Sequence, residues 1–396
     1  MDDASLRPVF NKYQQITMSN NKFIIFAVDH FNPLGVIRSL GEVGIYPIVI
    51  LFSEHESILV KYCKYIQILH QVRSIEEGYK ILMREYSSEP ERPFLLATSD
   101  DIESFLDLHY EDLKNHFHFF NAGKQGRITK MMEKSEIVRM AQEVGLDTPK
   151  TEEVTLGQRP KTLRYPILTK STISTLHNWK SNVFICRNEK ELMDAYRQIK
   201  GERVILQEYI EKTDELNIEG FCINNGKDVY MPLQNRYFRT TDKSYGNYVY
   251  IEKYSHNELT DKIKQLFQNT GYNGIFEMEF MIGNGGKLYF LEINFRNSAW
   301  LYAYTRCGLN FPLMYSKSIS EGKIIDEDAH IKKLPFTLMD ELTDFKWSVL
   351  SGKVSMFKWI KELWSVDCLF YFNKKDPRPF YMYLFNRMKK GLNKCL

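Results

Sequence analysis

The sequence predicts a mixed α/β protein: an N-terminal doubly wound parallel sheet, then antiparallel-rich α+β lobes, then a helical, aromatic-rich C-terminal extension. In the first 120 residues, apolar runs alternate with helical patterns. In the middle, strand-like runs at 217–224, 228–234 and 247–252 follow one another closely, as in antiparallel sheets. The chain has 396 residues, which is long for one hydrophobic core, so we expect two or three lobes.

The N-terminal region has the pattern of a βαβ unit. An apolar run at 22–28 is followed by a helical pattern at 36–44 and a second apolar run at 46–52. Further runs up to about residue 98 continue the alternation. The first strand is not followed by GxGxxG, so we do not predict a dinucleotide site. Residues 1–120 are expected to form one small doubly wound domain.

The next stretch predicts a second unit over residues 121–210. Residues 130–145 carry apolar side chains at helical spacing and end at Gly145. Strands are expected at 164–170 and 203–209, the first of them closing on Lys170. Lys134 lies near the start of the helix, where a solvated surface lysine is the alternative interpretation.

The stretch from Ile275 to Arg296 predicts a β-hairpin with a polar face. Gly283 to Gly286 provide the backbone freedom for a tight reversal. If Ile282 pairs with Lys287, alternation sorts the side chains into an apolar face and a polar face. The polar face would then carry Glu277, Glu279, Glu292, Asn294 and Arg296.

This set of side chains suits a metal and a phosphate. Carboxylate and amide oxygens on neighbouring strands are suitable ligands for Mg²⁺ that carries the phosphates of a nucleotide. Arg296 lies one alternation further along, where it can reach a phosphoryl group held by that metal. The alternative is a solvated sheet face with a cross-strand Glu/Arg pair.

The composition limits the classes of binding partner and the cellular compartment that we expect. The net charge is only +3 and no lysine/arginine block of nucleic-acid type occurs, so we do not expect a nucleic-acid partner. The first residues lack a signal-peptide pattern, and no apolar run has the length of a transmembrane helix. Six scattered cysteines fit reduced thiols better than disulfides or a zinc site. We expect a cytoplasmic protein.

These residues resemble the ATP-grasp superfamily, and within it carboxylate-amine ligases of the D-aspartate ligase-like type. The strongest motif is Glu279-Phe280 followed by the stretch from Leu291 to Arg296, which is similar to the EF…EINPR signature with Phe295 in place of proline. The resemblance implies a Rossmann-like pre-ATP-grasp domain (1–120), a small nucleotide-covering lobe (121–210), a large lobe with the metal site (211–325) and a C-terminal extension (326–396).

The resemblance also implies roles for individual residues. The metal ligands would be Glu279, Glu292 and Asn294, with Glu277 beside them, and Arg296 would stabilise the transferring phosphoryl group. The nucleotide phosphates would be bound by Lys134 and Lys170. The adenine hinge would be Gln207, Glu208, Tyr209 and Ile210, and the ribose carboxylate Glu215 or its neighbour Asp214. The arginines that approach phosphate or the acid substrate would be Arg236 and Arg239.

One segment departs from the family pattern. Residues 171–182 should form a glycine-containing loop over the phosphates, but STISTLHNWKSN has no glycine. His177 and Lys180 are alternative phosphate contacts, although His177 is also a plausible surface residue.

The resulting hypothesis is an ATP-dependent carboxylate-amine ligase with ATP and Mg²⁺ as cofactors, Mn²⁺ being an alternative metal. Its substrates would be a small-molecule carboxylate and an amine, such as an amino acid or peptide of cell-envelope or secondary metabolism. Two other classes stay open: an ATP-binding regulatory or scaffold module without catalysis, and a kinase on the same fold. A homodimer is also left open.

The C-terminal extension is rich in aromatic residues. We expect Trp347, Trp359 and Trp364, with Phe357 and Ile360, to pack a helical lobe. The alternative is an amphipathic surface that makes peripheral contact with an anionic membrane. The basic residues available to it are Arg387, Lys389, Lys390 and Lys394.

Overall fold

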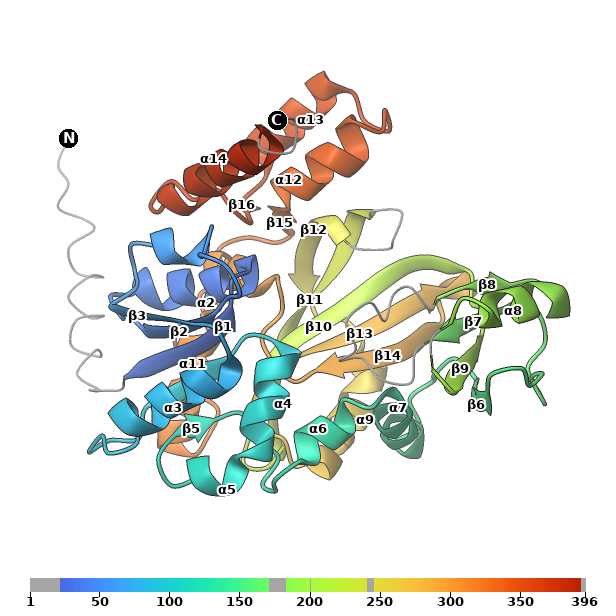
Figure 1. The fold of residues 1–396 in the computed structure, drawn as a ribbon, viewed down its shortest axis with the longest axis horizontal. Helices are drawn as coiled ribbons and strands as arrows, with labels where there is room; N and C mark the ends of the chain where they lie inside the picture. The colour runs from blue at the N-terminus through green and yellow to red at the C-terminus, as the bar shows by residue number, and fades with distance from the viewer. Residues whose placement is uncertain (1–21, 171–182, 200, 241–245, 393–396) are drawn as a thin grey trace.

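The computed structural model describes residues 22–170, 183–199, 201–240 and 246–392, which form three β-sheets. In Figure 1 the N-terminal sheet is blue, the large sheet runs from yellow-green to orange through the centre, and a small green sheet lies at the far end of the large one. The red C-terminal helices lie beyond the edge of the large sheet that carries β15 and β16, on the side of the N-terminal sheet.

The N-terminal sheet is parallel, as predicted. Its strand order is β3-β2-β1-β4-β5. The central strand is buried on both faces, because α2 packs on one side while α3 and α4 pack on the other. The strands are β1 (Phe23–Val28), β2 (Ile48–Phe52), β3 (Ile68–Val72), β4 (Phe94–Ala97) and β5 (His118–Phe119), and the helices are α2 (Phe31–Gly41), α3 (Ile75–Tyr86), α4 (Asp100–Leu108) and α5 (Tyr110–Leu113).

The small sheet is antiparallel, with the order β6-β9-β7-β8. It consists of β6 (Thr151–Thr155), β7 (Ile167–Lys170), β8 (Ile185–Cys186) and β9 (Arg203–Glu208), and α8 (Glu189–Tyr196) packs on it. The single helix expected at 130–145 is two helices, α6 (Arg127–Met131) and α7 (Lys134–Glu143). Glu133 between them has an extended backbone, so Lys134 begins the second helix.

The large sheet has seven strands in the order β14-β13-β10-β11-β12-β15-β16. Its strands are β10 (Lys212–Ile223), β11 (Asp228–Thr240), β12 (Gly246–Lys253), β13 (Gly274–Gly283), β14 (Leu288–Asn294), β15 (Phe336–Met339) and β16 (Cys368–Leu369). Helix α9 (Asn257–Thr270) covers the apolar face, where the rings of Phe267 and Phe276 lie 4.1 Å apart. Helices α10 (Leu301–Cys307) and α11 (Phe311–Glu321) follow the hairpin.

The C-terminal extension is helical, as predicted, but it also completes the large sheet. Its helices are α12 (Glu341–Asp344), α13 (Met356–Ser365) and α14 (Arg378–Leu392). β15 pairs with β12, and β16 adds a further edge strand. The sequence did not reveal these strands, because four and two residues are too few to show an alternating pattern. Among the described residues no helix has both the length and the apolar character needed to span a membrane.

The aromatic residues of the extension do not all pack inside it. Trp359 is buried against Phe345 and donates its indole N–H to Asp344 at 2.8 Å. In contrast, Phe357 and Trp364 are 83% and 84% exposed. The expectation that these aromatic side chains pack a helical lobe is therefore wrong for Phe357 and Trp364. Their positions on α13 point away from Trp359.

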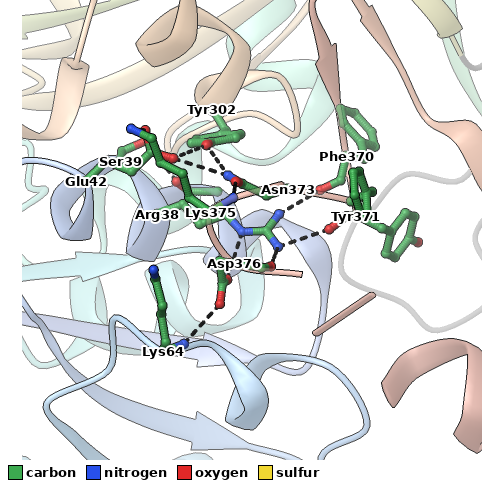
Figure 2. Close-up of polar contacts among 12 residues, drawn as sticks. Arg38, Ser39, Glu42, Lys64, Tyr302, Phe370, Tyr371, Asn373, Lys375 and Asp376 are labelled. Carbon is green, nitrogen blue, oxygen red and sulfur yellow. Dashed lines mark hydrogen bonds and ion pairs between the residues drawn. The ribbon is translucent and has the colours of Figure 1, made fainter. Parts of the chain in front are cut away.

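A buried ion pair fixes the extension to the N-terminal sheet (Figure 2). Arg38 on α2 is fully buried, and its Nε donates to Asp376 Oδ2 at 3.1 Å. The other guanidinium nitrogens donate to the backbone carbonyls of Phe370, Tyr371 and Asp376 at 3.0–3.2 Å. Asp376 in turn accepts from the backbone N–H of Lys64. The Arg38–Asp376 pair is thus the buried centre of the contact between the first and last parts of the described chain.

The Arg38–Asp376 pair should contribute to the stability of the whole fold. The variant Asp376→Ala tests this. We expect the variant to lose about 3 kcal/mol of unfolding free energy, because Arg38 would stay buried without its carboxylate. Urea unfolding followed by circular dichroism measures the change. Lys375→Ala is the neighbouring control: its ammonium group pairs with Glu42 at 3.4 Å but its side chain is 62% exposed, so the pair should contribute less than about 1 kcal/mol. Equal losses in the two variants would show that the carbonyl partners alone hold Arg38.

Candidate active site

Polar side chains gather on one face of β10, β13 and β14. In the observed register Glu279 lies opposite Glu292, and Glu277 lies opposite Asn294. On the other side of β13, Glu279 pairs with Asn217. Directly paired residues share a face of a sheet, so the strands place these groups together. The face carries Glu215, Asn217, Glu277, Glu279, Glu292 and Asn294.

A β-bulge at Leu291 sets this arrangement. Ile282 pairs with Leu288, not with Lys287 as expected, so the predicted register is wrong by one residue beside the turn. The register then shifts between Glu279 and Phe280, and Leu291 is left without a partner. A bulge of this kind returns the next side chain to the opposite face. Glu292 consequently joins Glu279 despite the displaced turn.

The carboxylates are crowded and poorly hydrated. Asn294 Nδ2 donates to Glu277 Oε2 at 3.1 Å and to Glu279 Oε1 at 2.9 Å. Burial, followed by the charges of Glu292 and Glu277, raises the pKa of Glu279 well above its usual value. Burial raises the pKa of Glu277 to about 7. Like charges held this close favour a bound cation, which would stabilise their ionised forms.

Two lysines from separate elements face the carboxylates. Lys134 Nζ lies 3.5 Å from Glu292 Oε2, and its side chain is 13% exposed. Lys170 ends β7, where burial and then the charge of Lys134 lower its pKa to about 8. The charges of Glu292 and Glu279 act on it in the opposite direction. The structure therefore brings both predicted phosphate lysines to the predicted carboxylates.

Arg296 connects this face with the N-terminal sheet. Its Nε donates to Asp100 Oδ1 at 2.8 Å, and its Nη2 donates to Asp100 Oδ2 at 3.2 Å. Nη2 also lies 3.4 Å from Asn294 Oδ1. Only 15% of the Arg296 side chain is exposed. A two-point ion pair of this geometry fixes the guanidinium plane as well as its charge.

The N-terminal sheet also contributes to the site, which the sequence did not predict. Asp100 follows β4 and His30 follows β1, and these neighbouring parallel strands end at the same edge. Burial lowers the pKa of His30 to about 4, and the charge of Arg296 adds to this, so the ring is neutral at physiological pH. Buried Thr98 Oγ1 and Glu103 Oε1 have no hydrogen-bond partner among the described residues. The positions of His30 and Asp100 directly after predicted parallel strands could have indicated this, because open α/β sheets bind ligands beyond the carboxyl ends of their strands.

The predicted adenine hinge joins the small sheet to the large one. Gln207 and Glu208 end β9, and Tyr209, Ile210 and Glu211 lead to β10. The backbone N–H of Tyr209 donates to Pro166 at 3.2 Å, and that of Glu208 to Lys150 at 2.9 Å. These bonds hold the connection against the small sheet.

The two candidates for the ribose carboxylate lie on different faces. Glu215 is on the carboxylate face, where it pairs with Lys212 and where burial raises its pKa. Asp214 is on the opposite face and accepts from Arg236. The geometry favours Glu215.

Arg236 and Arg239 do not reach the carboxylate face. Arg236 lies opposite buried Leu216 in the register, so its side chain emerges on the other face of the sheet. Arg239 follows a register shift and donates to Asp344 at 3.0 and 2.7 Å and to Glu362 at 2.7 Å. The structure therefore does not support the predicted catalytic positions of these two arginines. Each is paired with an acid outside the site.

The segment expected to cover the phosphates (171–182) lies outside the described residues, as do its candidate contacts His177 and Lys180.

The oxygen donors on the carboxylate face fit Mg²⁺. Within the described ranges no three His, Cys, Asp or Glu side chains converge as a preformed metal site. Mg²⁺ commonly uses only one or two carboxylates and completes its octahedron with water and substrate phosphates. Glu279, Glu292 and the amide oxygen of Asn294 would provide such a partial set.

Several solved structures have a fold similar to that of this chain. No family model and no curated protein sequence matches the chain. Among solved structures, N5-carboxyaminoimidazole synthetase from Staphylococcus aureus is similar, with a TM-score of 0.64, 15% identity and coverage of 84% of this chain and 86% of that one. L-Amino acid ligase from Bacillus licheniformis gives 0.59, with 16% identity and 77% coverage of each chain.

The biotin carboxylase domain of Hydrogenobacter thermophilus 2-oxoglutarate carboxylase, solved with MgADP and bicarbonate, is also similar. Its TM-score is 0.61, with 17% identity and coverage of 79% of this chain and 73% of that one. The chain therefore has the ATP-grasp fold, which confirms the predicted fold class. At these identities the likeness establishes the fold alone. The D-aspartate ligase-like subgroup and the exact domain boundaries stay predictions.

The lowered pKa of Lys170 makes nucleotide affinity dependent on pH. Lys170 is protonated below about pH 8 and loses its charge above it, so affinity for MgATP should fall as the pH rises from about 7 to about 9.5. Titration calorimetry at several pH values measures this. Lys170→Arg is the control, because its guanidinium stays charged and its affinity should change little over the same range. Parallel curves for the two proteins would contradict a phosphate contact by Lys170.

Proposed function

We propose that the protein is an ATP-dependent carboxylate-amine ligase. The observation that carries this is the convergence of Lys134, Lys170 and Arg296 on the Glu279/Glu292 pair. These groups come from three separate regions of the chain, and each would be costly to bury without a ligand or an opposite charge. Positioning and charge neutralisation are the main requirements of phosphoryl transfer.

In the proposed reaction a substrate carboxylate oxygen attacks the γ-phosphorus of ATP and ADP leaves. An amine nitrogen then attacks the acylphosphate carbon, and phosphate leaves as the amide forms. Lys134 and Lys170 would hold the nucleotide phosphates, and Arg296 would stabilise the negative charge of the transferring group. Mg²⁺, when bound, would neutralise phosphate charge at Glu279, Glu292 and Asn294. Asp100 would keep the guanidinium of Arg296 aimed at the site.

The remaining predicted roles fit the same scheme. The backbone around Gln207 to Ile210 would contact the adenine, and Glu215 the ribose. The substrates would meet beside His30 and Thr98, where the N-terminal sheet ends next to Arg296. One similar structure is named an L-amino acid ligase, which supports testing amino acids first.

An ATP-grasp kinase is the second candidate, since the same residues could transfer phosphate to a stable acceptor. Product trapping separates the two. A ligase should release phosphate from ATP only when both an acid and an amine are present, and hydroxylamine should replace the amine to give a hydroxamate. A panel of L- and D-amino acids with mass spectrometry of the products tests this. Phosphate transfer to a product stable towards hydroxylamine would favour the kinase, and absence of any ATP turnover would favour a binding module.

Replacement of individual arginines tests the assigned roles. Arg296→Ala should lower turnover by at least about 100-fold while changing MgATP affinity little, because its charge is needed most in the transition state. Arg236→Ala is the matched control from the opposite face of the sheet and should retain activity within about threefold. Steady-state phosphate release and calorimetry measure the two effects. A greater loss of turnover in the Arg236 variant would reverse the assignment.

A further inference from the structure

Helix α13 carries apolar side chains on two opposite faces. Trp359 faces the protein interior, where it is 9% exposed and bonded to Asp344. Phe357, Ile360 and Trp364 follow helical spacing on the other side and are 83%, 42% and 84% exposed. Solvated helices rarely expose three large apolar residues in one row. We call this row the α13 outer face.

Neighbouring parts of the extension repeat this pattern. On α14, Tyr381, Phe385 and Met388 are separated by four and three residues and are 58–69% exposed. Leu350 and Met356, before and at the start of α13, are also exposed. In Figure 1 both helices belong to the outermost, red part of the ribbon, on the far side of β15 and β16 from β13 and β14.

The charge of this region is one-sided. Residues 345–389 hold nine lysines and arginines against three acids, whereas the whole chain has 53 against 50. Each of the three acids has a basic partner from outside the segment: Glu362 pairs with Arg239, and also with Lys358 at 4.0 Å, Asp367 pairs with Lys333, and Asp376 pairs with Arg38. The acids are therefore turned inward, while Lys358 beside the α13 outer face is 66% exposed. The exposed surface of this region therefore consists mainly of aromatic and basic side chains.

We propose that the α13 outer face docks on an anionic lipid bilayer. Tryptophan and phenylalanine on a helix lying in the interface bury their rings between headgroups and acyl chains, and flanking lysines are attracted to anionic headgroups. Two copies of this chain would bring like-charged surfaces together, which disfavours self-association through this face. The protein would lie on the surface, because its described helices do not include one that could span the bilayer.

Vesicle co-sedimentation of the full chain tests the proposal. We expect binding to phosphatidylcholine vesicles containing about one third phosphatidylglycerol at low salt, with little binding to phosphatidylcholine alone or at high salt. The double variant Phe357→Ser/Trp364→Ser should bind at least about tenfold more weakly with an unchanged thermal midpoint. Tyr46→Ser, at an exposed aromatic residue of the N-terminal region, is the control and should bind like the wild type.

A second measurement does not depend on how that double variant folds. Brominated phospholipids should quench part of the tryptophan fluorescence of the wild type, and Trp364→Phe should keep binding but lose that part. Equal vesicle binding by the wild type and the double variant, or no binding of the wild type at low salt, would overturn the proposal. So would a doubling of molecular mass that Phe357→Ser/Trp364→Ser reverses, because the face would then be an interface between copies.

Discussion

Mutual repulsion among buried carboxylates is the constraint around which this molecule is arranged. Glu277, Glu279 and Glu292 lie on adjacent strands, and burial together with neighbouring negative charge disfavours the ionised forms of Glu277 and Glu279. Such a cluster persists only where cations or hydrogen-bond donors compensate it. Lys134, Lys170 and Arg296 surround it, and Asn294 donates to two of its members. A bound cation would stabilise the ionised forms of these carboxylates further.

The groups that compensate the carboxylates come from the N-terminal sheet, the small sheet with its preceding helix, and the large sheet. Lys170 ends a strand of the small sheet, Lys134 begins a helix between two sheets, and Asp100 orients Arg296 from the N-terminal sheet. Because Lys170 belongs to the small sheet, any movement of that sheet changes the field at the carboxylates. The N-terminal and large sheets also share one apolar core, so packing and electrostatics both hold the site together.

Local patterns predicted the elements that are locally determined. The parallel N-terminal sheet, the hairpin and the carboxylate-rich polar face of the hairpin followed from periodicity and turn residues. The bulge at Leu291 did not, because a single unpaired residue leaves no periodic signal. Arg236 and Arg239 were misplaced because their partners decide their positions, and Asp344 lies 105 residues beyond Arg239 in the chain. Asp100 was missed for the same reason, since it meets Arg296 across 196 residues.

The ion pair between Arg38 on α2 and Asp376 also bears on how the protein folds during synthesis. Arg38 is separated from Asp376 by 338 residues. At ordinary rates of translation, Asp376 is therefore added on the order of tens of seconds after Arg38. Until Asp376 is available, the N-terminal sheet carries the unpaired charge of Arg38 at a position that is buried in the folded protein. The nascent N-terminal sheet should consequently reach its final packing only after Asp376 has left the ribosome. Its need for chaperones should therefore last until that segment has been synthesised.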